Sequence, residues 1–120
     1  MDLFLDKNDH DTALPTDKEA AAYLRDKQLS FSKGVTEVRY SEDGMARVVI
    51  LESEHGFFTS CLQEIFFFDE DELNYFPDQY PAWWHTVAEG SGLYGTKEIA
   101  LREIMAHPKY KARFLNDEFI

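Results

Sequence analysis

The stretch from Phe57 to Phe68, FFTSCLQEIFFF, constrains the fold more than any other part of the chain. It contains five phenylalanines, together with Leu62 and Ile65, and its single charged residue is Glu64. A segment this apolar, rich in β-forming residues and free of proline, would promote aggregation if it were exposed. We therefore predict a long strand in an inner position of a sheet, with most of its length buried.

Two further strands are predicted before this one. Residues 35–41 alternate, with Thr36, Val38 and Tyr40 on one side and charged residues on the other, which is typical of a half-buried strand. A turn at Asp43-Gly44 leads to residues 45–52, which contain the unbroken apolar run VVIL. The pattern predicts an antiparallel meander of three strands, and the turn length, which sets the register, stays open.

Helices are predicted on both sides of these strands. Thr16 and Glu19 have the spacing of a capping box, which predicts a helix that continues to about Leu29. After the strands, Asp69 and Glu72 are spaced to cap a short helical turn.

The C-terminal third predicts three more helices. Residues 82–89, AWWHTVAE, follow Pro81 and precede Gly90, which favours a helix with Trp84 on its buried stripe. Thr96 is placed to cap the next helix, and Pro108 separates it from a last short one. The fold class predicted for residues 1–120 is one α+β domain: an N-terminal helix, an antiparallel meander of three or more strands, and C-terminal helices packed on the sheet. Residues 1–15 are predicted to form a loosely ordered lead-in.

Composition favours a cytoplasmic protein that does not enter membranes. No apolar run approaches the length of roughly 18 residues that a membrane helix needs. The first residues, MDLFLDKNDHD, are acidic where a secretory signal would be basic. Cys61 is the only cysteine, so it cannot form an internal disulfide.

The charge of the chain is unevenly distributed. The net charge is −11, and residues 48–96 contain no Lys or Arg while they contain nine acids. Such a field repels nucleic acid and acidic membranes and attracts basic proteins. The nine acids are Glu52, Glu54, Glu64, Asp69, Glu70, Asp71, Glu72, Asp78 and Glu89.

Large aromatic residues follow the densest acidic run, residues 69–72, within a short distance along the chain. Tyrosine and tryptophan frequently anchor protein interfaces, and a polar rim usually surrounds such anchors. We predict that Trp83, with Tyr75 or Tyr80, forms the anchor, and that the acids form the rim. The predicted partner-binding residues are Asp69, Glu70, Asp71, Glu72, Tyr75, Asp78, Tyr80 and Trp83.

Motifs for cofactors are weak. Residues 90–95, GSGLYG, match a dinucleotide-binding pattern, but we predict that they only connect two helices, because no second parallel strand is predicted after them. The four histidines are widely scattered and lack the spacing of zinc ligands. No cofactor and no metal are expected.

These features favour a small acidic binding protein that neutralises a basic partner, in the manner of a bacterial immunity protein that blocks a nuclease toxin. One alternative is a nucleic-acid mimic, such as a phage protein that disarms a defence enzyme. Another is a small enzyme that uses His85 or His55 with a carboxylate. A catalytic role is not expected, because the sequence contains no catalytic motif.

Overall fold

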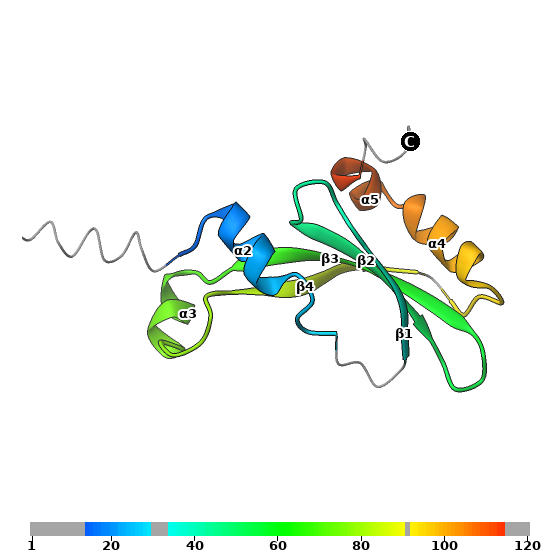
Figure 1. The fold of residues 1–120 in the computed structure, drawn as a ribbon, viewed down its shortest axis with the longest axis horizontal. Helices are drawn as coiled ribbons and strands as arrows, with labels where there is room; N and C mark the ends of the chain where they lie inside the picture. The colour runs from blue at the N-terminus through cyan, green and yellow to red at the C-terminus, as the bar shows by residue number, and fades with distance from the viewer. Residues whose placement is uncertain (1–13, 30–33, 91, 115–120) are drawn as a thin grey trace, which may run out of the picture.

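The computed structural model describes residues 14–29, 34–90 and 92–114, and these form an α+β fold (Figure 1). Four strands pair antiparallel in chain order: β1 (Gly34–Tyr40), β2 (Ala46–Glu52), β3 (Phe58–Phe67) and β4 (Ala82–Glu89). The helices are α2 (Asp17–Leu24) before the sheet, α3 (Glu70–Tyr75) between β3 and β4, and α4 (Lys97–Met105) and α5 (Pro108–Arg113) after it. The predicted α+β class and the antiparallel meander are confirmed. Most of the predicted lead-in, residues 1–13, lies outside the described residues.

The apolar strand β3 is an inner strand, as predicted. It pairs with β2 along one side, where Leu62 lies opposite Val48, and with β4 along the other, where Ile65 lies opposite Trp84. Burial is concentrated in the middle of the strand, and Phe66 near its end is 37% exposed. The expectation that most of the stretch from Phe57 to Phe68 is buried therefore fails at its two ends, where Phe57, just before the strand, is 45% exposed and Phe66 is 37% exposed.

Residues 82–89 form strand β4, so the predicted helix at this position is wrong. The segment fits both periods, because Ala82 and Trp84 are buried on one face of a strand, while Trp84 and Ala88 share a helical stripe; in the sheet, a register shift places Ala88 on the opposite face. The second edge of β3 explains why the segment forms a strand and not a helix. A meander that ended at β3 would leave the most apolar strand of the chain with unpaired backbone groups, and β4 pairs with them.

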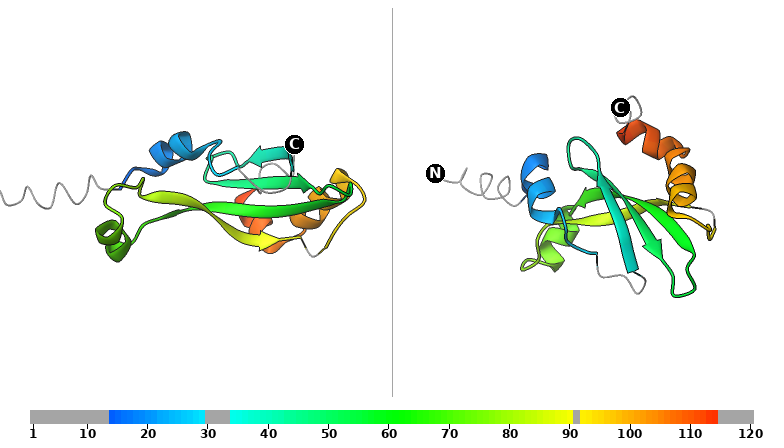
Figure 2. Two further views of the ribbon diagram at one scale, coloured as in Figure 1. Left: turned by 90° about the horizontal axis from the view of Figure 1, so that it is seen from below. Right: turned by 45° about the vertical axis from the view of Figure 1, so that its right-hand side comes forward.

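Helices cover the two faces of the sheet at different places (Figure 2). On one face, α4 and α5 pack against Val48, Ile50 and Leu62. On the opposite face, α2 packs against Ile65 and Trp84. This arrangement follows from strand alternation, because side chains of successive residues point to opposite faces.

The predicted starts of α2, α4 and α5 are confirmed. The Thr16 capping box starts α2, Thr96 caps α4, and Pro108 is the first residue of α5. The helix α2 ends at Leu24 and not near Leu29: the Lys27 N–H donates a hydrogen bond of 2.9 Å to the Leu24 carbonyl oxygen in a tight turn, and Gln28, whose φ is 61°, has left helical geometry.

Helices α4 and α5 leave part of their face of the sheet uncovered. The Nε atom of Arg113, the last residue of α5, lies 3.5 Å from a carboxylate oxygen of Glu64 on β3. Beyond this ion pair, towards α3, the same face continues with Phe66 on β3 and with Trp83 and His85 on β4.

The helices within the described residues are all too short or too polar to span a membrane.

Candidate functional site

Two consecutive tryptophans on β4 lie in different surroundings. Trp84 points to the face that α2 covers and is 3% exposed. Trp83 points to the opposite face, beyond α5, and is half-buried. The alternation of a strand places one large aromatic side chain on each face.

The Trp84 side is closed by contacts within the chain. The indole N–H of Trp84 donates a hydrogen bond of 2.7 Å to the carbonyl oxygen of Leu24, the last residue of α2. The guanidinium carbon of Arg47 lies 4.2 Å from the centroid of a Trp84 ring, within the range of a cation–π contact. Trp84 therefore has both a partner for its N–H group and a cation over its ring.

Arg47 is completely buried and connects three elements on this side. It donates hydrogen bonds to Gln63 Oε1 at 2.7 Å and to the carbonyl oxygens of Arg25 and Gln28 at 3.2 and 3.3 Å. The last turn of α2 contains no basic residue, so Arg47 supplies the positive charge that the carbonyl end of a helix favours. Burial lowers the pKa of Arg47, an interaction with Tyr40 opposes this, and an arginine remains charged in such a setting.

The side chain of Gln28 covers part of the free edge of β4. Gln28 Oε1 accepts a hydrogen bond of 2.7 Å from the backbone N–H of Trp84, and Gln28 Nε2 donates one of 3.3 Å to the backbone oxygen of Trp84. The amide side chain thus takes the place of one residue of a fifth strand. This contact blocks strand addition at Trp84, in the first half of the edge strand.

On the other side of β4, four aromatic side chains form what we call the Trp83 patch: Phe66, Phe68, Phe76 and Trp83. The centroid of the Trp83 ring lies 5.8 Å from that of Phe66 and 5.7 Å from that of Phe68, and Phe68 lies 6.2 Å from Phe76. Phe66 and Phe76 are 37% and 47% exposed. The patch is therefore a contiguous aromatic surface that is only partly covered.

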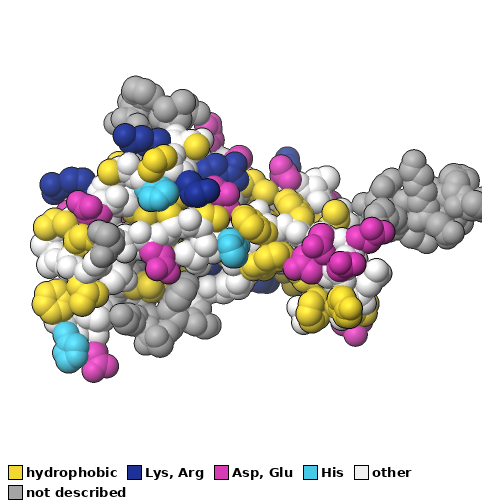
Figure 3. All heavy atoms as spheres, turned by 180° about the vertical axis from the view of Figure 1, so that it is seen from behind, with side chains coloured by type: hydrophobic (Ala, Val, Ile, Leu, Met, Phe, Trp, Pro, Cys, Tyr) yellow, Lys and Arg dark blue, Asp and Glu magenta, His cyan; other side chains and the backbone are white. Residues whose placement is uncertain are grey.

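Acidic side chains border this patch at the end of the molecule formed by α3 (Figure 3). We call them the acidic tip: Asp69, Glu70, Asp71, Glu72 and Asp78. Glu72 is half-buried, and the others are exposed.

The nine acids of residues 48–96 do not form one continuous surface. Glu52 and Glu54 lie at or beyond the end of β2, at the opposite end of β3 from the acidic tip. Within the described part of the chain, Glu64 is the only one of the nine within 4.0 Å of a Lys or Arg nitrogen. The acidic tip therefore has no lysine or arginine counter-ion among these residues.

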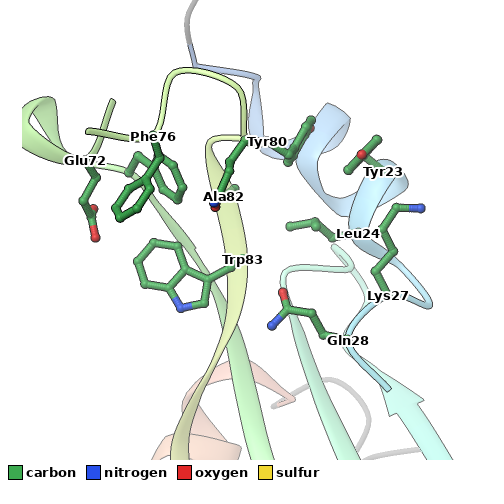
Figure 4. A pocket seen from close by; sticks show the side chains of 11 residues that line it. Tyr23, Leu24, Lys27, Gln28, Glu72, Phe76, Tyr80, Ala82 and Trp83 are labelled. Atoms are coloured by element: carbon green, nitrogen blue, oxygen red, sulfur yellow. The ribbon is translucent and has the colours of Figure 1, made fainter. Parts of the chain in front are cut away.

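A groove of about 600 Å³ crosses the edge of β4, and three residues of the Trp83 patch, Phe68, Phe76 and Trp83, line it (Figure 4). Glu72, Phe76 and Trp83 lie on one side of the strand, and Tyr23, Lys27 and Gln28 lie on the other. The lining comes from α2 and the residues after it, from the end of β3 with the α3 region, and from β4. The lining residues are Tyr23, Leu24, Lys27, Gln28, Phe68, Glu72, Phe76, Gln79, Tyr80, Ala82 and Trp83.

The groove brings together three of the predicted site residues: Glu72, Tyr80 and Trp83. Tyr80 belongs to the α2 side, where its ring stacks on Tyr23 with centroids 3.7 Å apart. Tyr75 is 79% exposed at the end of α3 and does not line the groove. The predicted site residues outside the groove lining are Asp69, Glu70, Asp71, Tyr75 and Asp78.

The sequence reasoning did not include Phe66 and Phe68 among the site residues. Strand alternation puts both on the face of Trp83, once β4 is recognised as a strand that pairs with β3. Phe76, which directly follows the predicted anchor residue Tyr75, completes the patch. The alternation of Phe66 and Phe68 could have placed both beside Trp83, but only if residues 82–89 had been assigned to a strand.

The two histidines considered for catalysis, His85 and His55, lie outside this groove, and so does Cys61. His85 is exposed and lies opposite Glu64 in the β3–β4 register, but the Glu64 carboxylate pairs with Arg113. His55 Nε2 lies 3.9 Å from a Glu54 carboxylate oxygen in an exposed turn. Burial raises the pKa of the Cys61 thiol to about 11, which disfavours the nucleophilic thiolate.

The glycine-rich residues 90–95 connect a strand to a helix, so the predicted connection between two helices is wrong. The N–H and carbonyl groups of Tyr94 exchange hydrogen bonds of 2.8 Å with the backbone of Phe58, which holds the segment against the start of β3. The four described strands are all antiparallel and α5 follows α4, whereas a dinucleotide-binding unit needs a parallel strand after its helix.

The comparisons with family models, curated proteins and solved structures gave no match. The function is therefore inferred from the groove, the Trp83 patch and the acidic tip.

Proposed function

We propose that this chain is a small acidic binding protein that neutralises a basic protein partner, as an immunity protein neutralises a nuclease toxin. The observation that carries the proposal is the position of the Trp83 patch directly beside the acidic tip. The surface thus combines aromatic side chains that can be buried by a partner with carboxylates that have no lysine or arginine counter-ion among the described residues.

The Trp83 patch has the composition of an interface centre. Aromatic residues contribute most of the binding free energy in many interfaces, while the polar rim contributes less and keeps water out. A partner that covers Phe66, Phe76 and Trp83 buries rings that are now partly exposed. Burial of this apolar area favours the complex.

The acidic tip provides the complementary charge. A nuclease needs a cationic cleft to hold the phosphate groups of its substrate. Carboxylates at the acidic tip are attracted to such a cleft, and opposite potentials accelerate the encounter of two proteins. A protein bound across the cleft blocks the nucleic acid without any catalytic step.

Affinity capture from the cells that produce the chain, followed by a nuclease assay, tests this proposal. The expected partner is a basic protein whose nuclease activity is lost when one equivalent of the chain is added. A second capture with Trp83→Ala should recover much less of this partner.

The matched control for charge is Glu54→Gln, because Glu54 is an exposed acid at the opposite end of β3 from the acidic tip. This variant should capture the partner as well as the parent chain does. Recovery of an acidic partner, or an undiminished nuclease activity at excess chain, would contradict the proposal.

A further inference from the structure

We propose that the half of the groove formed by Phe68, Phe76, Trp83 and Glu72 is a subsite for one arginine side chain. In the complex this arginine belongs to the basic partner, so its biological role rests on the function proposed above. The guanidinium group stacks on the Trp83 ring and faces the Glu72 carboxylate. Arginine fits this chemistry because its planar cation combines stacking on aromatic rings with charge-assisted hydrogen bonds to carboxylates.

The protein places its own cations over aromatic rings in the same way on the opposite side of β4. The guanidinium carbon of Arg25 lies 4.1 Å from the ring centroid of Tyr40, and the Lys27 ammonium lies 4.6 Å from that of Tyr23. With Arg47 over Trp84, these are the cation–π contacts of the described residues, and all three involve the α2 side. Trp83 has no such contact among the described residues.

The absence of a cation over Trp83 follows from the sequence around it. Phe68, Phe76 and Trp83 belong to residues 48–96, which contain no Lys or Arg. The nearest basic residue in the groove lining is Lys27, and its ammonium is placed over Tyr23 on the other wall. Among the described residues, no Lys or Arg is placed over Trp83, so this aromatic and acidic wall is open to a cation from another molecule.

Glu72 is held in position for this role. Its Oε1 atom accepts a hydrogen bond of 2.9 Å from the backbone N–H of Asp69, and its own N–H donates one of 2.9 Å to Asp69 Oδ1. This reciprocal capping box fixes the side chain before any ligand arrives. Figure 4 shows Glu72 on the same side of β4 as Phe76 and Trp83. A fixed carboxylate loses little conformational entropy when it binds a cation.

The free edge of β4 favours binding of a side chain here over addition of a peptide strand. Strand addition would need the outward backbone groups of Trp84, which already exchange hydrogen bonds with the side chain of Gln28. A side chain that enters the groove beside Trp83 leaves those hydrogen bonds intact.

An NMR titration at low salt tests the subsite without the partner. The probe is N-acetyl-arginine amide, and the neutral analogue N-acetyl-citrulline amide has nearly the same shape without the charge. The arginine probe should shift the indole N–H resonance of Trp83 saturably. The citrulline probe should bind more weakly by a factor of about five or more, because a cation–π contact at an exposed site contributes about 1 kcal/mol. Comparison of the affinity of a lysine probe with that of the arginine probe shows whether the subsite prefers a planar cation to an ammonium group.

Two variants with matched controls locate the effect. Glu72→Gln keeps the capping box, because glutamine also serves at this position, but it removes the charge. Its control is Glu70→Gln, which removes the same charge from α3 outside the groove lining. Phe76→Leu removes an aromatic ring of the subsite, and Tyr75→Leu removes the neighbouring exposed ring outside the lining. Glu72→Gln and Phe76→Leu should weaken arginine binding at least twofold, and the two controls should not.

The results distinguish failure of this inference from failure of the proposed function. Equal shifts with arginine and citrulline, or equal effects of Glu72→Gln and Glu70→Gln, would overturn the arginine subsite. Capture of a basic nuclease would then still support the proposed function. Charge-selective binding at Trp83 together with capture of no basic partner would support the subsite and contradict the proposed function.

Discussion

The two sides of β4 differ in how their aromatic side chains are paired. Trp84 receives a hydrogen-bond acceptor from α2 and a cation from Arg47, and it is 3% exposed. Trp83, the preceding residue, contacts other aromatic rings and lies beside acids, and no described cation is placed over it. The difference teaches that the same residue type stabilises the fold on one side and contributes to a partly exposed aromatic surface on the other.

The distribution of basic residues explains the difference. Arg25, Lys27 and Arg47 precede residue 48 in the sequence, and α2 and β2 bring them to the Trp84 side. The Trp83 patch consists of residues from the segment without Lys or Arg. Trp84 therefore receives its cation from a basic residue that precedes this segment, whereas no described cation is placed over Trp83.

The largest expected effect is on folding stability. Trp84→Ala should lower the free energy of unfolding by about 3–5 kcal/mol, because it empties a buried site and leaves the Leu24 carbonyl without its donor. Trp83→Ala should lower it by about 1 kcal/mol or less, because the side chain is only half-buried. Chemical denaturation of both variants measures the contrast. Equal losses of unfolding free energy in the two variants would contradict the difference described between Trp84 and Trp83.

The buried arginine gives the next largest effect. Arg47→Met keeps much of the side-chain volume but leaves the carbonyl oxygens of Arg25 and Gln28 and the Gln63 amide oxygen without this donor. The expected loss is about 1–3 kcal/mol, the range found when a buried polar group loses its partner. Denaturation curves measure it, with the exposed residue Arg102→Met as the control. A variant as stable as the parent chain would show that Arg47 does not hold α2 on the sheet.

A smaller effect is expected at the edge of β4. Gln28→Ala removes both hydrogen bonds to the backbone of Trp84 and should cost about 1 kcal/mol. It also exposes the backbone groups of Trp84 on an edge strand, so self-association at high concentration should increase. Sedimentation of the parent chain and the variant over a range of concentrations measures this. A variant that stays as monodisperse as the parent would contradict the role of Gln28 as an edge cap.

The smallest effect on stability, and the one that sharpens the functional contrast, concerns the acidic tip. The double variant Asp71→Asn with Glu72→Gln should change the free energy of unfolding by about 0.5 kcal/mol or less. It should slow association with a captured basic partner and flatten its salt dependence, whereas Trp83→Ala should mainly speed dissociation. Stopped-flow rates at low and high salt separate the two effects. Association that is indifferent to salt in the parent chain would place the interface elsewhere.

The sequence predicted the inner position of β3 because the composition of residues 57–68 leaves few alternatives. It failed for residues 82–89, where eight residues fit a helix and a strand, and the decision depended on pairing with a strand some twenty residues away. Trp84 was placed in the core from a helical stripe, and it is buried for a different reason, strand alternation. The burial of Trp84 was thus predicted correctly, although the secondary structure predicted for it was wrong.

The site was predicted only in part for a similar reason. The acids of residues 69–72 and Trp83 stand out in the sequence, but Phe66 and Phe68 join Trp83 only through the pairing of β3 with β4. The burial of Arg47 could not be predicted from its strand pattern, because two of its partners are backbone carbonyl groups of Arg25 and Gln28. Every residue has a backbone carbonyl group, so the sequence does not show which of these groups accepts a hydrogen bond from Arg47.

Selective quenching of tryptophan fluorescence tests most directly the claim that the Trp83 side is open and negative while the Trp84 side is closed. Trp84→Phe leaves Trp83 as the only tryptophan, and Trp83→Phe leaves Trp84, so each indole can be measured alone. Quenching constants for caesium and iodide ions are normalised to those of free N-acetyltryptophanamide. We expect caesium to quench Trp83 more strongly than iodide does, because the acidic tip borders the Trp83 patch, and both ions to quench Trp84 very little. Stronger quenching of Trp83 by iodide than by caesium, or equal quenching of the two tryptophans, would contradict the account.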